Sequence, residues 1–151
     1  MTRSDLLRFL RAQPWAVDAS VNGEGKPEAA VIGVAVNEKL ELVFDTLSAS
    51  RKAANLQVNP RIALVIGWDD AQTVQIEGLV DEPTGDELQR LKDDYLLGFP
   101  DGHERAALAA IAYFRVSPVW IRYSDFRSTP PTVIVFSAEE LQRPVDGRTA
   151  E

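Results

Sequence analysis

The 151-residue chain contains no cysteine, which excludes disulfide bonds, thiol nucleophiles and thiolate-bound metal ions. Its one histidine, His103, is too little for a histidine-based metal cluster, so we expect no metal centre. No apolar run approaches the roughly 18–20 residues of a membrane-spanning helix. A segment typical of a secretory signal is also lacking, and we therefore expect a cytoplasmic protein with no membrane partner.

Basic residues are scarce as well. The chain has 16 Lys and Arg against 23 Asp and Glu, a net charge of −7, whereas a general nucleic-acid binder presents a basic surface. We therefore expect no nucleic-acid partner. The glycine-rich phosphate loops of common nucleotide-binding folds and the G-x-S-x-G motif of hydrolases are absent. The length predicts one domain over residues 1–151, with a frayed tail from about residue 144.

The pattern of apolar residues predicts a mainly β protein with helical insertions. We expect strands over residues 15–21, 28–36, 40–44, 61–68, 73–80, 112–123 and 132–136. We expect helices over residues 4–12, 51–58, 86–97 and 103–111, with Ser4 and Ser50 as caps of the first two, and a capped turn that starts at Ser137. The runs 29–36 and 62–66 are almost wholly apolar, which is typical of strands buried on both faces. The first three strands have no helix between them, which favours an antiparallel meander within a small barrel over an α/β sheet.

The most informative stretch joins the end of a strand to a short helix. Three hydroxyl residues, Thr46, Ser48 and Ser50, are followed by Arg51 and Lys52 at the point where the helix begins. The start of a helix presents unpaired N–H groups and a positive dipole end, both of which suit a phosphate group. The stretch therefore indicates a phosphate site, and the alternative is a capped helix with two solvated cations.

At this point the chain resembles the pyridoxamine 5′-phosphate oxidase-like split β-barrel family of flavin-binding proteins. The motifs that carry the resemblance are, in order, Phe44-Asp45-Thr46, Ser50-Arg51-Lys52, Asn59-Pro60-Arg61, Trp68 and Glu77-Gly78. The similarity runs from about Phe9 to Phe126. It implies a six- to seven-stranded antiparallel split β-barrel, and a homodimer with two flavin mononucleotide (FMN) sites at the subunit interface.

The resemblance also implies which residues bind FMN. The phosphate would be held by Thr46, Ser50, Arg51 and Lys52. The isoalloxazine ring would lie along Ala30, Val31 and Ile32. From the other subunit, the flavin would be approached by Thr73, Gln75, Trp120 and Arg122. No side chain stands out as catalytic, which suits an enzyme whose cofactor carries the chemistry.

The implied function is an FMN-dependent oxidoreductase that takes electrons from a reduced nicotinamide or another reduced carrier. The vitamin-forming oxidases carry Arg and Lys where this chain has Ala30 and Ala35, and they end in an Arg-rich signature that this chain lacks. We therefore expect an unidentified small-molecule substrate other than pyridoxamine phosphate. Two alternatives remain open on the same fold: a reductase that uses a deazaflavin coenzyme, and a non-catalytic protein that holds a flavin or a haem.

Overall fold

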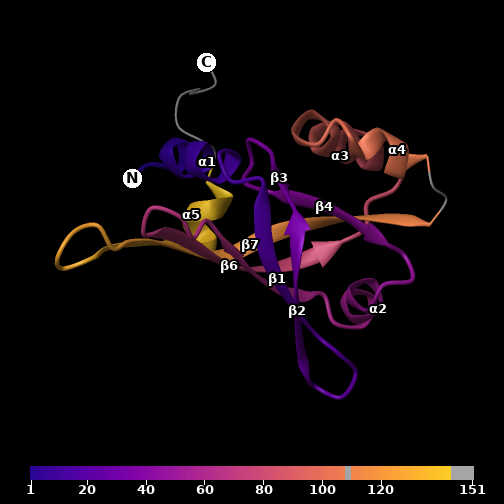
Figure 1. Ribbon diagram of the computed structural model, residues 1–151, viewed down its shortest axis with the longest axis horizontal. Helices are drawn as coiled ribbons and strands as arrows, with labels where there is room; N and C mark the ends of the chain where they lie inside the picture. The colour runs from indigo at the N-terminus through magenta and orange to yellow at the C-terminus, as the bar shows by residue number, and fades with distance from the viewer. Residues whose placement is uncertain (108–109, 144–151) are drawn as a thin grey trace.

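The computed structural model describes residues 1–107 and 110–143, and shows a curled antiparallel sheet with helices packed around its ends (Figure 1). The strands are β1 Trp15–Val21, β2 Pro27–Gly33, β3 Ala35–Val36, β4 Leu42–Leu47, β5 Arg61–Ile66, β6 Gln72–Asp81, β7 Ile111–Asp125 and β8 Thr132–Ser137. The helices are α1 Arg3–Arg11, α2 Arg51–Val58, α3 Gly85–Gly98, α4 Gly102–Ala106 and α5 Ala138–Gln142. The predicted mainly β architecture with helical insertions is confirmed.

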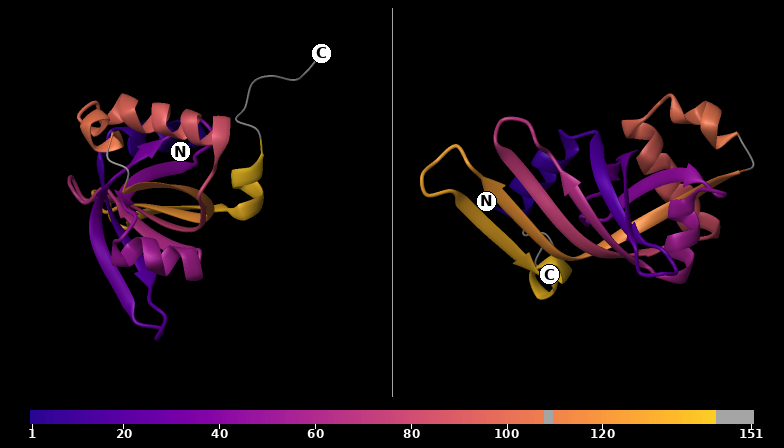
Figure 2. Two further views of the ribbon diagram at one scale, coloured as in Figure 1. Left: turned by 90° about the vertical axis from the view of Figure 1, so that its right-hand side faces the viewer. Right: turned by 60° about the horizontal axis from the view of Figure 1, so that its bottom comes forward.

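The strand order explains why the sheet curls. The strands are arranged β2-β1-β5-β6-β7-β4-β3, and β8 pairs with the last residues of β7, from Trp120 to Asp125. Strands β2 and β3 stand at opposite ends of this order, yet only Val34 separates them in the chain. The two ends of the sheet are therefore held next to each other, and the sheet closes into a split barrel, as the two views in Figure 2 show.

The strand predicted over residues 28–36 is correct in place but broken in two. Its first part, β2, pairs with β1, and its last two residues, β3, pair with β4. The pairing order of the predicted meander is confirmed, while the break at Val34 raises the number of strands in the described residues to eight. The next strand begins at Leu42 rather than residue 40, because Leu40 lies in a turn with a φ of 62°.

The core lies inside the curl and is built from one side of each strand. Along β5 and β6 the burial alternates, so that every second side chain faces inward. Phe44 of β4 and Phe114 of β7 stack at 5.5 Å between ring centroids, and α1 adds Leu6 and Leu10, both fully buried. The inner positions of neighbouring strands thus form one apolar cluster.

In a single chain the apolar runs are buried on one face, and burial of the other face by a dimer partner stays a prediction. In the run 29–36 Val31 is 65% exposed, and in the run 62–66 Val65 is 39% exposed. Only alternate residues of β5 reach the core, whereas Ala63 and Val65 face away from it. The physical reason is that one copy of the chain supplies a core to the inner face of the sheet only.

Two of the three predicted helix caps are confirmed. Ser50 caps α2, and Ser137 caps α5 with Glu140 in a reciprocal capping box. Ser4 is not the cap of α1. Thr2 caps this helix instead, because its hydroxyl accepts a hydrogen bond from the Asp5 N–H (3.1 Å), while the Asp5 carboxylate accepts one from the Thr2 N–H (2.7 Å).

Two predicted boundaries near the ends of strands also need correction. The helix predicted over residues 103–111 is the shorter α4, and Ile111 already belongs to β7, where it pairs with the end of β4. The strand predicted over residues 61–68 ends at Ile66, because Gly67 adopts a φ of 77°. A φ in this range favours glycine and turns the chain out of the sheet.

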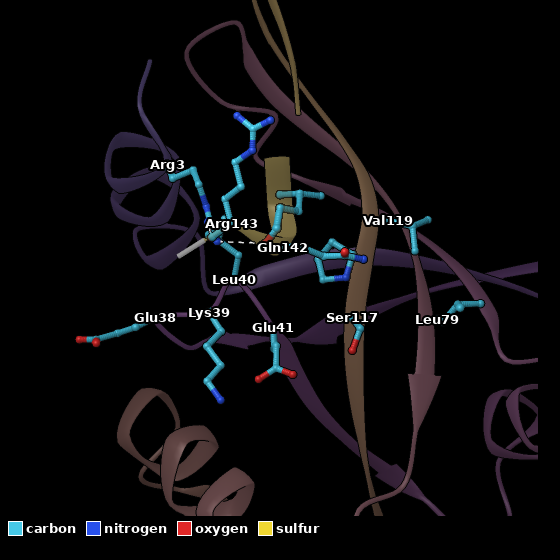
Figure 3. A pocket seen from close by; sticks show the side chains of 12 residues that line it. Arg3, Glu38, Lys39, Leu40, Glu41, Leu79, Ser117, Val119, Gln142 and Arg143 are labelled. Atoms are coloured by element: carbon cyan, nitrogen blue, oxygen red, sulfur yellow. Dashed lines mark hydrogen bonds between the residues drawn. The ribbon is translucent and has the colours of Figure 1, made fainter. Parts of the chain in front are cut away.

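A cavity of about 430 Å³ lies where α1 approaches the C-terminal helix α5 (Figure 3). The guanidinium of Arg3 donates hydrogen bonds to the backbone oxygens of Leu141 (3.2 Å) and Arg143. These bonds fasten α1 to the end of α5. None of the predicted cofactor residues lines this cavity. Within residues 1–107 and 110–143, no helix has the length and apolar character needed to cross a bilayer.

Strand β7 contains a β-bulge next to Ser117-Pro118, where its pairing with β6 shifts. Glu77 pairs with Trp120, whereas the next residue, Gly78, pairs with Pro118, so that Val119 is the extra residue of β7. The two strands approach so closely here that a Cβ atom on Gly78 would lie 2.7 Å from Val116 Cγ1 and 3.0 Å from the Ser117 carbonyl oxygen.

We predict that Gly78→Ala lowers the free energy of unfolding by about 1–3 kcal/mol, because the added methyl group meets backbone atoms that cannot rotate away. Chemical denaturation followed by circular dichroism would measure the change. Gly23→Ala is the matched control, because a Cβ atom there has no neighbour within 4 Å. An equal stability of the two variants would contradict the close approach at the bulge.

Candidate functional site

Helix α2 begins with two hydroxyl groups in contact. The Ser50 Oγ accepts a hydrogen bond from the backbone N–H of Ala53 (3.1 Å), which caps the helix. Thr46, at the end of β4, places its Oγ1 3.0 Å from the Ser50 Oγ. The predicted phosphate residues Thr46, Ser50, Arg51 and Lys52 therefore lie together at the start of α2, where N–H groups of the first turn face outward.

Each of the two cations at this helix start faces an acidic residue. Lys52 Nζ lies 3.4 Å from Asp18 Oδ1, and Arg51 Nη2 lies 3.1 Å from Glu28 Oε2. The first pair is well buried, since the side chains of Lys52 and Asp18 are 14% and 1% exposed. Arg51 remains mostly exposed. The hypothesis of two solvated cations is thus wrong for Lys52, which lies beneath the surface of the barrel end.

The acids are held in place by a polar network under α2. Buried Asn55 donates hydrogen bonds from Nδ2 to the Ser20 Oγ (3.1 Å) and to the Glu28 Oε1 (2.7 Å). Burial raises the pKa of the Asp18 carboxyl, and the nearby positive charge of Lys52 opposes this rise. Arg51, Lys52 and Asn55 therefore face a set of oxygen atoms supplied by β1 and β2.

Four residues of this network were not predicted from the sequence, namely Asp18, Ser20, Glu28 and Asn55. A signal for the first two was present, because Asp18 and Ser20 fall on the alternate positions of β1 that an amphipathic strand assigns to the core. Polar residues in core positions need hydrogen-bond partners, so these two positions indicate a buried polar network. Glu28 pairs directly with Ser20 in the β1–β2 hairpin, so the same reasoning extends to it.

A cavity that we call the α2 pocket lies beside this network. It has a volume of about 230 Å³ and is lined by Asp18, Ser20, Glu28, Ala29, Ala30, Ser50, Arg51 and Lys52. Figure 1 shows α2 beside the end of the β1–β2 pair. Three predicted phosphate residues and one predicted ring residue, Ala30, therefore share this pocket.

A second cavity, the aromatic pocket, adjoins the first at Lys52, which lines both. Its volume is about 250 Å³, and its walls are Trp15, Val31, Ile32, Gly33, Asp45, Thr46, Lys52, Tyr95, Phe99 and Asp101. The Phe99 ring stacks on Tyr95 at 4.9 Å and meets the edge of Trp15 at 6.0 Å. The Phe99 ring packs directly on Gly33, which has no side chain. A Cβ atom at Gly33 would lie only 2.8 Å from the ring.

Strand β2 runs past both pockets with one edge free. In the described part of the chain, β2 stands at the end of the strand order and pairs only with β1. A free strand edge presents backbone N–H and C=O groups. Ala30 lines the α2 pocket, while Val31 and Ile32 line the aromatic pocket. The three predicted ring residues thus lie between a cationic end and an aromatic end of one region.

The remaining predicted cofactor residues lie elsewhere in the chain. Gln75 of β6 pairs directly with Arg122 of β7, and Thr73 and Trp120 belong to the same two strands. None of these four lines the α2 pocket or the aromatic pocket. The Arg122 Nε is buried without a hydrogen-bond partner in the described structure. Contact of these residues with a cofactor stays a prediction that requires a second copy of the chain.

Comparison with known proteins identifies the family of the chain. A family model described as pyridoxamine 5′-phosphate oxidase matches residues 3–125. The chain belongs to the pyridoxamine 5′-phosphate oxidase-like family. The pyridoxine/pyridoxamine 5′-phosphate oxidase of Bordetella pertussis is 32% identical over 93 residues, which make up 61% of this chain and 42% of the relative. The chain spans about half the length of the curated relatives that it matches.

Solved structures of the same fold bind different cofactors. A haem-binding protein from Mycobacterium smegmatis is similar with a TM-score of 0.79 and 17% identity, over 93% of this chain and 60% of the other. A pyridoxamine 5′-phosphate oxidase-related, FMN-binding protein from Nostoc punctiforme gives a TM-score of 0.67 and 13% identity, over 89% and 88% of the two chains. These likenesses confirm the predicted FMN-binding split-barrel type of fold.

We predict that Ser50 has separable roles as a helix cap and as a phosphate ligand. Ser50→Ala removes the bond to the Ala53 N–H and should lower the free energy of unfolding by about 1 kcal/mol. Ser50→Asp keeps a capping oxygen, so its stability should stay near the wild-type value. Its added negative charge should nevertheless weaken the binding of a phosphate compound. Thermal melts and flavin titrations of both variants measure the two effects, and a parallel loss in both assays would contradict separate roles.

Proposed function

We propose that the protein is a homodimeric FMN-binding oxidoreductase whose FMN phosphate binds at the start of α2. The observation that carries this proposal is the convergence of Ser50, Arg51 and Lys52 on one pocket next to the free edge of β2. Family membership supports it, because residues 3–125 match the oxidase family model. We further propose a reduced nicotinamide or another reduced carrier as electron donor, and a small-molecule substrate.

The residues of the two pockets fit the parts of FMN. Two cations and two hydroxyl groups at a helix start form a donor set for a phosphate, and Arg51 is able to donate two parallel hydrogen bonds to it. The aromatic pocket offers Trp15 and Phe99 as apolar surface for a ring. When bound, the flavin supplies hydride or electron transfer. The role of this chain is then to neutralise the phosphate and to keep water from the ring.

The same pockets support a substrate other than pyridoxamine phosphate. Ala30, where the vitamin-forming oxidases carry Arg, lines the α2 pocket and offers no charge. Ala35 lies in β3, partly buried against the cluster around Tyr95. A second phosphate group, carried by the substrate, would therefore find no cation at either position. This supports an uncharged or differently charged substrate.

The outer face of the sheet supports the proposed homodimer. One row of directly paired residues crosses six strands in register, and consists of Val31, Val17, Val65, Gln75, Arg122 and Val135. Three of its valines are between 39% and 65% exposed. Val31, Val17 and Val65 are neighbours in this row and form an apolar patch, and an exposed apolar patch marks an interaction site. A second copy that covered this face would supply the burial that the apolar strands lack.

The dimer would also explain the predicted residues that lie far from the pockets. Gln75 and Arg122 stand in the middle of the outer row, and Trp120 belongs to the neighbouring row. Val31 belongs to this same row and also lines the aromatic pocket. A partner that docks on the row is therefore placed next to that pocket, and its own Arg122 would lie at the same interface.

The alternatives of haem and deazaflavin are distinguishable by experiment. His103 is the only histidine of the chain, and it is exposed on α4, outside both pockets. A deazaflavin coenzyme has a longer acidic tail, which would bring further negative charge to a pocket that already contains Asp18 and Glu28. Both observations support FMN over these alternatives.

We predict that the purified protein takes up FMN and that Arg51→Gln weakens the binding about tenfold. A hydrogen bond from a charged donor contributes about 1.5–3 kcal/mol, and the lower figure applies here because the Arg51 side chain is 78% exposed. Titration followed by flavin fluorescence and visible absorption measures the affinity.

Lys26→Gln is the matched control, since this Lys lies in the β1–β2 turn, is 71% exposed and pairs only with Glu24 among the described contacts. Its affinity should equal that of the wild type. A Soret band with haem, or tighter binding of a deazaflavin than of FMN, would replace the proposed cofactor. If no flavin binds at all, the proposed function is wrong.

We predict that Val65→Asp converts the dimer to a monomer, because it places a charge in the centre of the outer row. Sedimentation velocity would show the mass falling by half, and FMN affinity should fall with it. Val58→Asp is the control, because Val58 is 81% exposed at the end of α2 and does not belong to the row. A wild-type protein that sediments as a monomer would refute the dimer.

A further inference from the structure

Asp18 is a buried carboxylate in the wall of the α2 pocket, and one of its oxygens lacks a hydrogen-bond partner. The residue is 1% exposed and faces inward from β1. Its Oδ1 accepts no hydrogen bond from the described residues. Buried polar atoms are nearly always satisfied, so an orphaned carboxylate oxygen beside a pocket points to a donor that a ligand brings.

The groups that face Asp18 do not supply this donor. Lys52 Nζ, from α2, lies 3.4 Å away, which exceeds the 2.7–2.9 Å that is typical of a charge-assisted hydrogen bond. The Ser20 hydroxyl accepts a hydrogen bond from Asn55 and gives none to Asp18 Oδ1, while Glu28, from β2, accepts from Asn55 and pairs with Arg51. Lys52 thus forms a long ion pair with Asp18 Oδ1 and leaves this oxygen able to accept a shorter hydrogen bond.

The charges of the α2 pocket give a second reason to expect a proton at Asp18 when a phosphate binds. Arg51 and Lys52 are balanced by Asp18 and Glu28, so that the four groups together are neutral. A phosphate monoester carries about −1.5 to −2 charges at pH 7. Its arrival would leave two anionic groups, the phosphate and the buried Asp18, facing each other across Lys52. Like charges at a desolvated site favour the uptake of a proton by one of them.

We propose that Asp18 contacts the phosphate group of the bound ligand through a shared proton. This inference rests on the proposed function, since it takes the α2 pocket as the phosphate site. The proton comes from solvent and lies between Asp18 Oδ1 and a phosphate oxygen, and no covalent bond to phosphorus forms or breaks. The orphaned oxygen gains a hydrogen bond, the repulsion is removed, and Lys52 and Arg51 remain charged. The raised pKa of the Asp18 carboxyl agrees with this proton uptake.

Proton uptake makes phosphate binding dependent on pH in a defined direction. Above about pH 7 the free phosphate monoester is fully ionised, because its second pKa is near 6. In this range each unit of rising pH should weaken FMN binding about tenfold, as expected for a site that binds one proton together with its ligand. Riboflavin has no phosphate, and its binding should not change with pH in the same range.

The decisive experiment compares the wild type with Asp18→Asn and Glu28→Gln in FMN titrations between pH 7.0 and pH 8.5, about 1.5 units in which the phosphate is ionised. The Asn amide donates a hydrogen bond without taking up a proton, so Asp18→Asn should bind FMN with a pH-independent affinity. Glu28→Gln removes the other acid, and should bind FMN more tightly at every pH while keeping the tenfold dependence per pH unit. Calorimetry of the wild type in two buffers of different ionisation enthalpy counts the proton directly, and does not depend on the folding of a variant.

The outcomes test the shared proton at Asp18 separately from the proposed FMN-binding function. One proton taken up with FMN and none with riboflavin, together with a flat profile in Asp18→Asn, supports the shared proton. FMN binding with the same pH dependence in wild type and Asp18→Asn overturns it and leaves the proposed cofactor intact. Failure of the wild type and both variants to bind FMN at any pH refutes the proposed function itself.

Discussion

Helix α2 is attached to the barrel in two ways: Ala53 and Leu56 pack into the apolar core, and polar contacts join the start of the helix to β1 and β2. Lys52 faces Asp18, Arg51 faces Glu28, and Asn55 bonds to both strands. These contacts fix the start of the helix next to the free edge of β2 and bring Thr46 and Ser50 together. Everything that the site offers to a ligand depends on this attachment, since the cations, the hydroxyl groups and the strand edge come from separate segments of the chain.

The helix α2 and its cap were predictable because the signals are local. Ser50 before the helix and Asn59-Pro60 after it define the ends without reference to the rest of the chain. The cap of α1 was also within reach of the sequence, because Thr2 has Asp5 three residues later, as a capping box requires, whereas Ser4 has Leu7 at that position. The break at Val34 was not predictable from an apolar run, since it follows from the closure of the barrel.

The two acidic residues of the site, Asp18 and Glu28, were not predicted for a different reason. Asp18 and Glu28 belong to strands whose alternation is readable, but their pairing with Lys52 and Arg51 depends on which end of the barrel α2 covers. The apolar runs predicted burial on both faces, and the single chain buries only one of them. Val31 and Val65 are exposed in the single chain, and an apolar sequence pattern does not distinguish a residue that faces a core from one that faces another chain.

The excess of acidic residues in the chain limits where affinity for a phosphate can arise. A chain with a net charge of −7 repels anions at long range, but salt limits this repulsion to about 10 Å. Affinity for a phosphate must then arise from short-range contacts inside the pocket. Two unpaired cations would bind any small anion. Cations that are already paired with Asp18 and Glu28 bind only a ligand whose own contacts offset the loss or weakening of those ion pairs. The buried acids therefore lower the general attraction for anions and favour a ligand whose shape and hydrogen bonds match the whole site.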